Sequence, residues 1–371
     1  MKCKLEDIVD VTMGQSPKSE YYNTEGKGYP FLQGNRTFGF KYPTFDTYTT
    51  VMTKPANAGD VIMSVRAPVG DLNITPVDMC LGRGVCSLRM KNGNQDFLFY
   101  MMKYYIPHLL KKESGTVFGS VNRNDINGLE IDIPEDAQVQ KKIARYLEMI
   151  DDKIELNNAI NNNLADLLQT IYQGRFGNDI LAVNQGVLSD ICSYSTDKVA
   201  VSELNVRTYF STENMLSGKA GSTEATSLPT TSQTTACHKG DTLISNIRPY
   251  FKKIVYCEDK CGCSTDVLCF TPSQPCYSAY LFSTLYADKF FAFMVAGSKG
   301  TKMPRGDKQQ IMTYPVVLPS EEELAGFNTI ASPLLEQIYS NRAENKRLSI
   351  LRDTLLPKLM SGEIDVSAIQ L

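Results

Sequence analysis

The sequence predicts a mixed α/β (α+β) protein built from two similar modules, each followed by a long helix. Three observations support this. The chain of 371 residues repeats itself at a nearly constant offset, each half alternates short strands with turns, and each half ends in a heptad pattern. An offset that drifts by only a few residues is typical of a duplicated domain, because chance matches would scatter. We therefore expect two modules related by pseudo-twofold symmetry. Such a pair of modules suits a target that is itself roughly twofold symmetric, and duplex DNA is the commonest target of this kind.

The repeat is clearest in a strand that begins with Gly-Asp. The segment 59–64 returns as 240–245, an offset of 181 residues, and Gly115-Thr116 returns as Gly300-Thr301, an offset of 185. The helical residues repeat at an offset of 184. These are Ile154, Asn157, Asn161, Leu164, Leu167 and Thr170, matched by Ile338, Asn341, Asn345, Leu348, Leu351 and Thr354.

Within each half the elements are expected in the same order. Alternation predicts strands, apolar residues at helical spacing predict a helix, and a proline closes the last strand. In the first half we expect strands at 60–65 and 84–90, a helix at 97–112 broken by Pro107, a loop at 113–127 and a strand at 129–133. In the second half we expect strands at 241–247 and 267–270, a helix at 279–295, a loop at 296–308 and a strand at 314–318.

The long helices carry heptad patterns with steps of four and three, which predict a coiled-coil seam. Two asparagines fall in the seam of each helix. A buried asparagine amide needs a partner, and its best-attested use is to fix register. The predicted seam residues are Ile150, Ile154, Asn157, Asn161, Leu164, Leu168, Leu334, Ile338, Asn341, Asn345 and Leu348.

Composition and charge are those of a globular protein with local basic segments. The net charge is −3, but the stretches 103–123 and 288–308 are both basic and occupy the same place in their repeats. Neither a signal peptide nor a bilayer-spanning segment is evident, so we expect a cytoplasmic protein whose ten cysteines are thiols. Cys257, Cys261, Cys263 and Cys269 cluster near His238, but their spacing does not reproduce a zinc motif, so no metal is expected.

At this point the order of parts resembles the specificity subunit of type I restriction–modification enzymes, over essentially the whole chain. The residues that carry the resemblance are 59–70, 240–249, Pro134 with 138–143, and 355–364. The resemblance implies two target recognition domains at 1–135 and 179–319, a first spacer helix at 136–178, and a second spacer helix with a C-terminal tail at 320–371.

The resemblance also implies a non-catalytic reader. Each domain would bind one half of a bipartite double-stranded DNA site. The two helices would pack antiparallel as a spacer and recruit two modification subunits, and larger assemblies would add restriction subunits. S-adenosylmethionine, ATP and Mg would then reside on those partners, with no cofactor on this chain. In the antiparallel pair, facing residue numbers sum to about 502, which places Asn157 opposite Asn345 and Asn161 opposite Asn341.

Base reading requires side chains that form paired hydrogen bonds, chiefly Arg, Asn and Gln, while Lys, Ser and Thr suit phosphate. The candidates in the first module are Gln33, Asn35, Arg36, Arg66, Ser114, Thr116 and Arg123. Those in the second are Arg207, Asn246, Arg248, Lys299, Thr301, Lys302 and Arg305.

Two alternatives belong to other classes. A coiled-coil scaffold would not require matched basic loops. A metal-dependent nuclease would use Asp241 with Glu258, Asp259 and Lys260, although a charged hairpin turn explains the last three equally well. The sequence has no Pro-Pro dipeptide for an adenine methyltransferase loop and no phosphate-binding Gly-x4-Gly-Lys loop.

Overall fold

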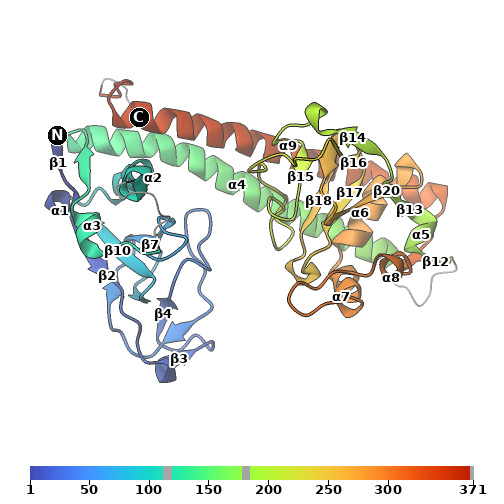
Figure 1. Ribbon diagram of the computed structural model, residues 1–371, viewed down its shortest axis with the longest axis horizontal. Coiled ribbons are helices and arrows are strands. Elements are labelled where there is room, and N and C mark those ends of the chain that lie inside the picture. Colours follow the sequence, from blue (N-terminus) through green and yellow to red (C-terminus); the bar gives the residue numbers. More distant parts are fainter. Residues whose placement is uncertain (112–118, 178–183, 368–371) are drawn as a thin grey trace. The chain divides into compact units, whose positions relative to one another are not determined.

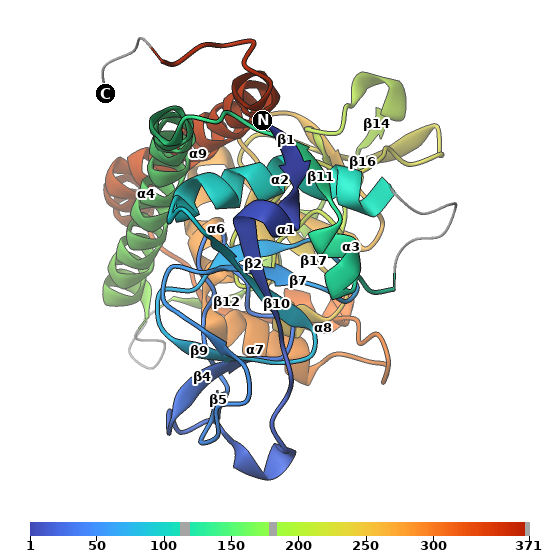
Figure 2. The same cartoon turned by 90° about the vertical axis from the view of Figure 1, so that its left-hand side faces the viewer.

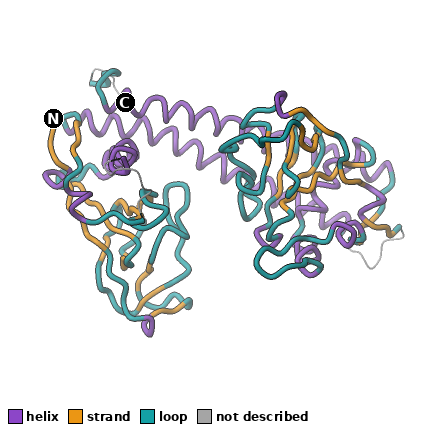
Figure 3. The backbone as a smooth tube through the Cα atoms, viewed as in Figure 1, coloured by secondary structure: helices purple, strands orange, loops and turns teal. Residues whose placement is uncertain are grey.

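The computed structural model describes the chain apart from residues 112–118, 178–183 and 368–371 (Figure 1). It forms two compact units, Met1–Asn157 with Glu344–Leu371, and Asn158–Ala343. Each unit therefore contains one strand-rich module together with parts of both long helices (Figure 3).

The first unit is built around an antiparallel sheet of order β2-β10-β7-β8. All four residues of β7, Val61–Ser64, are buried because both faces of this strand are covered. Helix α2, Gln95–Lys111, packs on the sheet and supplies the large buried side chains Phe97, Phe99 and Tyr100. The other strands of this sheet are β2 (Val9–Met13), β10 (Val85–Met90) and β8 (Leu72–Ile74).

Smaller elements complete the first unit. Strand β1 (Lys2–Lys4) pairs with β11 (Glu130–Asp132), and a second sheet has the order β3-β5-β4-β9-β6. The bounds of that sheet's strands are β3 (Tyr22–Asn23), β5 (Tyr48–Thr49), β4 (Tyr29–Leu32), β9 (Met79–Leu81) and β6 (Pro55–Ala56), and the short helices are α1 (Leu5–Ile8) and α3 (Arg123–Asn127).

The second unit repeats the main sheet of the first. Its order β13-β20-β17-β18 matches β2-β10-β7-β8 strand for strand, and Val267 pairs with Ser245 as Val85 pairs with Ser64. The strands are β13 (Cys192–Tyr194), β20 (Val267–Pro272), β17 (Thr242–Ser245) and β18 (Ile254–Tyr256). The equivalent topology is what the internal repeat predicts.

A second sheet, β14-β16-β19-β15, and short helices complete this unit. The remaining elements are β14 (Lys198–Ala200), β16 (Gln233–Cys237), β19 (Cys261–Cys263), β15 (Tyr209–Phe210), β12 (Gln185–Val187), β21 (Pro315–Val317), α5 (Leu188–Ile191), α6 (Ser278–Tyr286), α7 (Asp288–Ala296) and α8 (Lys308–Met312).

Two helix predictions were wrong in detail. Pro107 lies inside α2 and does not break it. The single helix expected at 279–295 is two helices, because Ala287 is extended (φ −63°, ψ 141°) and serves as the N-cap of α7. Asp288 then occupies the first turn of α7, where a negative charge is favourable.

The long helices are α4, Ala137–Phe176, and α9, Glu321–Met360, and within each unit they pair antiparallel. In the first unit Asn157 contacts Asn345, and in the second Asn161 contacts Asn341. In the first unit the strand-rich module packs against the two long helices, and Figure 2 shows its helix α2 beside α4.

The buried strip of each helix is wider than the predicted seam. Ile150 and Leu334 are half-buried, whereas their neighbours Asp151 and Leu335 are 0% and 4% exposed. The reason is that each module covers one side of the helix pair, so a residue next to the seam is also removed from water. Leu164 and Leu348 are half-buried, while Ile154, Leu168 and Ile338 are buried.

All ten cysteines are free thiols, and eight of them are buried. Cys237, Cys257, Cys261, Cys263 and Cys269 form part of a small apolar core in the second unit. Among the described residues, none of the helices is both long enough and apolar enough to cross a bilayer.

Candidate nucleic-acid interface

The strand that begins with Gly-Asp is anchored by its aspartate in both modules. Asp60 is buried, and one carboxylate oxygen accepts a hydrogen bond from the Ser87 hydroxyl (2.8 Å). Arg89 Nη2 lies 2.6 Å from the other oxygen. In the second module Asp241 is 1% exposed and accepts a hydrogen bond of 2.8 Å from the backbone N–H of His238. The aspartates thus fix the start of each strand and the position of the turn that follows it.

An exposed arginine follows this strand in each module. Arg66 forms a β-bridge with Ser120, which belongs to the loop before α3. Arg248 donates its backbone N–H to Pro304 O (2.8 Å) and adopts a left-handed conformation, with φ 51°. Within the described part of the chain, neither arginine side chain forms a hydrogen bond or an ion pair. Both guanidinium groups are therefore available to bind a ligand.

The basic loop of the second module is a hairpin over residues 299–305. Lys299 and Arg305 exchange two backbone hydrogen bonds of 2.9 Å, and Thr301 and Lys302 are exposed between them. Because Ile247 also bridges to Arg305, the hairpin is held against the turn that carries Arg248. The turn and the hairpin together form one exposed basic surface.

The corresponding loop of the first module is described only in part. Ser114 and Thr116 lie outside the described residues. Arg123 is exposed at the first position of α3, where Asn122 caps the helix by accepting hydrogen bonds from the backbone N–H groups of Asn124 and Asp125. The cap fixes the backbone from which Arg123 projects.

Several other basic candidates are held by carboxylates. Arg36 Nη2 donates to both carboxylate oxygens of Asp46 at 2.8 Å, and this hydrogen bonding lowers the pKa of Asp46 below its ordinary value. Exposed ion pairs are weak and screened by salt, so DNA can replace such a carboxylate. The remaining pairs are Arg207 with Glu224 (3.1 Å), Arg305 with Asp266 (3.0 Å), and Lys299 with Asp307.

Asn246 lies in the turn after β17, as predicted, but its side chain is only 6% exposed. Its side-chain oxygen faces Gly306, where an added Cβ would approach to 2.9 Å, so the residue packs against the basic hairpin. Asn35 is half-buried and donates to the carboxylate of Asp71, while Gln33 is exposed just after β4.

Two lysines next to the basic surface of the second module were not among the residues predicted from the sequence. Lys219 and Lys252 both adopt left-handed backbone conformations, and both ammonium groups bind Asp288, at 2.7 and 3.0 Å. The aromatic and basic run at 248–253, with Tyr250 half exposed, was the sequence signal that could have identified this region.

Three of the four residues of the nuclease alternative form contacts within the fold. Asp241 is buried, Asp259 accepts a hydrogen bond from Tyr339 (2.9 Å), and Lys260 pairs with Glu203 (2.9 Å). In the part of the chain that the structure describes, His, Cys, Asp and Glu side chains form no group of three or more that could hold a metal ion.

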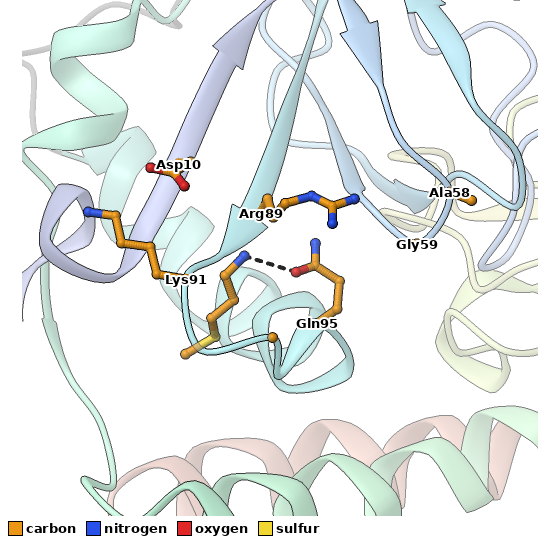
Figure 4. A pocket seen from close by; sticks show the side chains of 8 residues that line it. Asp10, Ala58, Gly59, Arg89, Lys91 and Gln95 are labelled. Atoms are coloured by element: carbon orange, nitrogen blue, oxygen red, sulfur yellow. Dashed lines mark hydrogen bonds between the residues drawn. The ribbon is translucent and has the colours of Figure 1, made fainter.

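A polar cavity of about 390 Å³ lies in the first unit, and three of its lining side chains are bonded to the surrounding fold (Figure 4). Arg89 pairs with Asp60, and Lys91 donates to the Glu6 carbonyl (2.7 Å). Gln95 accepts from the backbone N–H of Met90 (2.9 Å).

The asparagines of the helix pair satisfy one another. In the first unit Asn157 donates to Asn345 (2.8 Å) and to Glu344 (2.7 Å). In the second unit Asn341 donates to Asn161 (2.9 Å). Buried amides that bond across two helices fix register, since a shift would leave them without partners.

The chain was compared with known families and proteins. Residues 1–166 match the family described as Type I restriction modification DNA specificity domain. The chain is 40% identical over 153 residues to the putative type I restriction enzyme MjaX specificity subunit of Methanocaldococcus jannaschii, a match that covers 41% of this chain but only 36% of that protein. It is 21% identical to the MjaIX specificity subunit of the same organism, over 98% of this chain and 93% of that one.

The structural comparison extends over the whole fold. The type I restriction–modification S subunit from M. genitalium is similar with a TM-score of 0.56 at 18% identity, covering 99% of this chain and 96% of that one. Both units carry a main sheet of the same strand order, and an exposed arginine follows the equivalent strand in each. The chain is similar to type I restriction–modification specificity subunits, through the family match over residues 1–166 and the likeness to the MjaIX subunit over nearly its whole length.

Proposed function

We propose that this chain is the DNA-reading subunit of a type I restriction–modification complex, and that each module reads one half of a bipartite site. The observation that carries the proposal is the pair of exposed arginines, Arg66 and Arg248, which follow the same buried strand in each repeat beside a basic loop. Arginine reads guanine by a bidentate hydrogen bond in the major groove, and nearby lysines hold phosphates.

The helix pair is the proposed docking surface for two modification subunits. Its buried side is filled by the modules, yet large apolar residues remain exposed. Met149 and Leu156 on α4 are 52% and 56% exposed in the first unit, and Leu167 is 47% exposed in the second. Exposed apolar groups of this size favour a protein partner.

The chemistry is assigned to the partners. We propose that methyl transfer from S-adenosylmethionine to adenine belongs to the modification subunits, and that ATP- and Mg-dependent cleavage belongs to restriction subunits. The structural roles of Asp241 and Asp259 support a non-catalytic chain. A reader of genomic DNA works where that DNA lies, so the proposed location is the cytoplasm.

The test is reconstitution with the modification subunits, followed by sequencing of methylated adenines. A bipartite methylated motif is expected, together with binding that weakens steeply as salt rises, because phosphate contacts release counterions. Methylation without a bipartite motif would exclude the proposal.

A further inference from the structure

A buried charged network joins the first module to both long helices. Asp151 of α4 is fully buried, and Arg352 of α9 donates to its Oδ1 at 2.8 Å. From α2, the Tyr100 hydroxyl donates to Oδ2 at 2.9 Å and Lys103 Nζ lies 3.7 Å from the same oxygen. The carboxylate is thus held by three elements of the first unit.

The opposite charges of Asp151 and Arg352 stabilise each other in the buried network. Burial opposes the charge on Arg352, but the hydrogen bond with Asp151 outweighs it, so the pKa of Arg352 is raised. Burial lowers the pKa of Lys103. A buried carboxylate of this kind is strongly destabilising when its partner is removed, because its desolvation is no longer compensated.

The equivalent place in the second unit is apolar. At the offset of 184, Asp151 corresponds to Leu335 and Arg352 to Leu168, and these leucines are 4% and 1% exposed in one core. When Leu98-Phe99 is aligned with Leu281-Phe282, Tyr100 and Lys103 correspond to Ser283 and Tyr286. No member of the charged network is repeated.

The asparagine layers, in contrast, are the same in both halves. Asn157 and Asn161 correspond to Asn341 and Asn345, so a second copy of α4 would offer α4 the same amides that α9 offers. The asparagine amides set register, but by themselves they do not distinguish α9 from another α4. The charged layer can, because a second α4 would place Leu168 of that copy against Asp151.

We propose that the Asp151–Arg352 pair is a selectivity element that forces α4 to pair with α9 and excludes pairing of α4 with α4, or α9 with α9, between two copies of the chain. An α4–α4 pair would bury two carboxylates against leucine, and an α9–α9 pair would bury two guanidinium groups against leucine. The element protects the arrangement of two different modules on one helix pair. It concerns assembly of the chain itself and does not depend on which DNA is read.

The test is a full-length double variant, Asp151→Leu with Arg352→Leu. The variant removes both partners of the buried ion pair, and the Tyr100 hydroxyl and the Lys103 ammonium also lose the carboxylate, so circular dichroism first establishes that the chain folds. Two differently tagged copies are co-expressed, and one tag is purified. We expect co-purification to rise about tenfold or more over wild type, because the burial of an unpaired charge against leucine no longer opposes pairing between copies.

A cross-link distinguishes the kinds of pairing. Lys153 lies 3.5 Å from Glu344, so a zero-length carbodiimide cross-link between them reports α4 paired with α9. The dimer fraction of the double variant is expected to lose this cross-link. The matched control is Lys153→Leu, which removes a half-exposed ion pair from the neighbouring layer but keeps the hydrogen bond from Asn157 to Glu344. This control should show no more exchange between copies than wild type.

Three results would overturn the proposal: no exchange in the double variant, equal exchange in wild type or control, or dimers that retain the Lys153–Glu344 cross-link. If the leucine variant did not fold, Asp151→Asn with Arg352→Gln removes the charges while keeping polar groups. That variant must then exchange more than wild type for the proposal to stand.

Discussion

Arg305 Nη2 lies 3.0 Å from Asp266 Oδ1, whereas Arg248, whose turn supports the same hairpin, has no ion pair with any described residue. The two arginines therefore start from different states. Arg305 must leave a carboxylate before it can bind DNA, while the guanidinium of Arg248 is available at once. This difference separates two residues that sequence alone treats alike.

The first prediction concerns this pair. Arg248→Ala should weaken recognition of the second half-site by about 1–3 kcal/mol if the side chain makes a bidentate base contact. Arg305→Ala should weaken it less, because breaking the Asp266 ion pair offsets part of the gain on binding. The measurement is competition binding with DNA altered in one half-site at a time. Lys260→Ala, at an exposed cation that pairs with Glu203 and is not a candidate for DNA binding, serves as the control and should leave binding unchanged. A larger loss for Arg305→Ala would contradict the assignment.

The second prediction concerns modularity. Exchanging residues 1–134 for those of a relative should change one half of the methylated motif and leave the other half intact, because the main sheet of each unit is complete within that unit. Sequencing of methylated adenines after reconstitution gives the answer directly. A simultaneous change in both half-motifs would show that the modules do not read independently.

The third prediction is that the isolated chain neither methylates nor cleaves DNA. The carboxylates that a nuclease would need are bonded to His238 N–H and to Tyr339 instead of facing a shared metal position. The measurement is transfer of labelled methyl groups from S-adenosylmethionine, and nicking of plasmid with Mg²⁺, each without partner subunits. The complex with modification subunits is the positive control. Activity of the highly purified chain alone would sink the non-catalytic assignment.

Much of this architecture was predictable because the two halves of the chain repeat each other and can be aligned. The repeat located β7 and β17 and placed both Gly-Asp turns in equivalent positions. The heptads located α4 and α9, and antiparallel symmetry gave the Asn157–Asn345 and Asn161–Asn341 contacts. These features follow from local patterns or from a constant offset.

Other features depend on tertiary contacts that no local pattern encodes. Asn246 directly follows a buried strand and reads as a turn residue, yet Gly306 from a distant loop packs over it. Asp151 is not among the predicted seam residues, yet it is buried because α2 covers it and supplies Tyr100. Which arginines are held by carboxylates also depends on residues brought together only by the fold.

The fourth prediction tests the asparagine register. Asn341→Leu should destabilise the chain by about 1–3 kcal/mol, because Asn161 is left buried without the amide that donates to it. Adding Asn161→Leu should recover much of that loss, since an apolar pair leaves no unsatisfied group. Denaturant unfolding of the single and double variants measures the coupling, with Asn162→Leu on the exposed side of α4 as control. Strictly additive losses would mean that the two amides do not depend on each other.

The last prediction concerns the DNA spacer. Inserting one heptad after Asn161 in α4 and one before Asn341 in α9 preserves the seam, because a heptad returns each residue to the same face of the helix. Seven residues lengthen a helix by about 10 Å, which corresponds to about three base pairs of DNA. The unread gap in the methylated motif should therefore grow by about three base pairs while the bases read stay the same. Inserting the heptad in α4 alone is the control, because it puts Leu164 and Leu168 out of register with Ile338 and Leu334 and should abolish recognition instead of lengthening the gap. An unchanged gap with both insertions would show that the helix pair does not set the spacing.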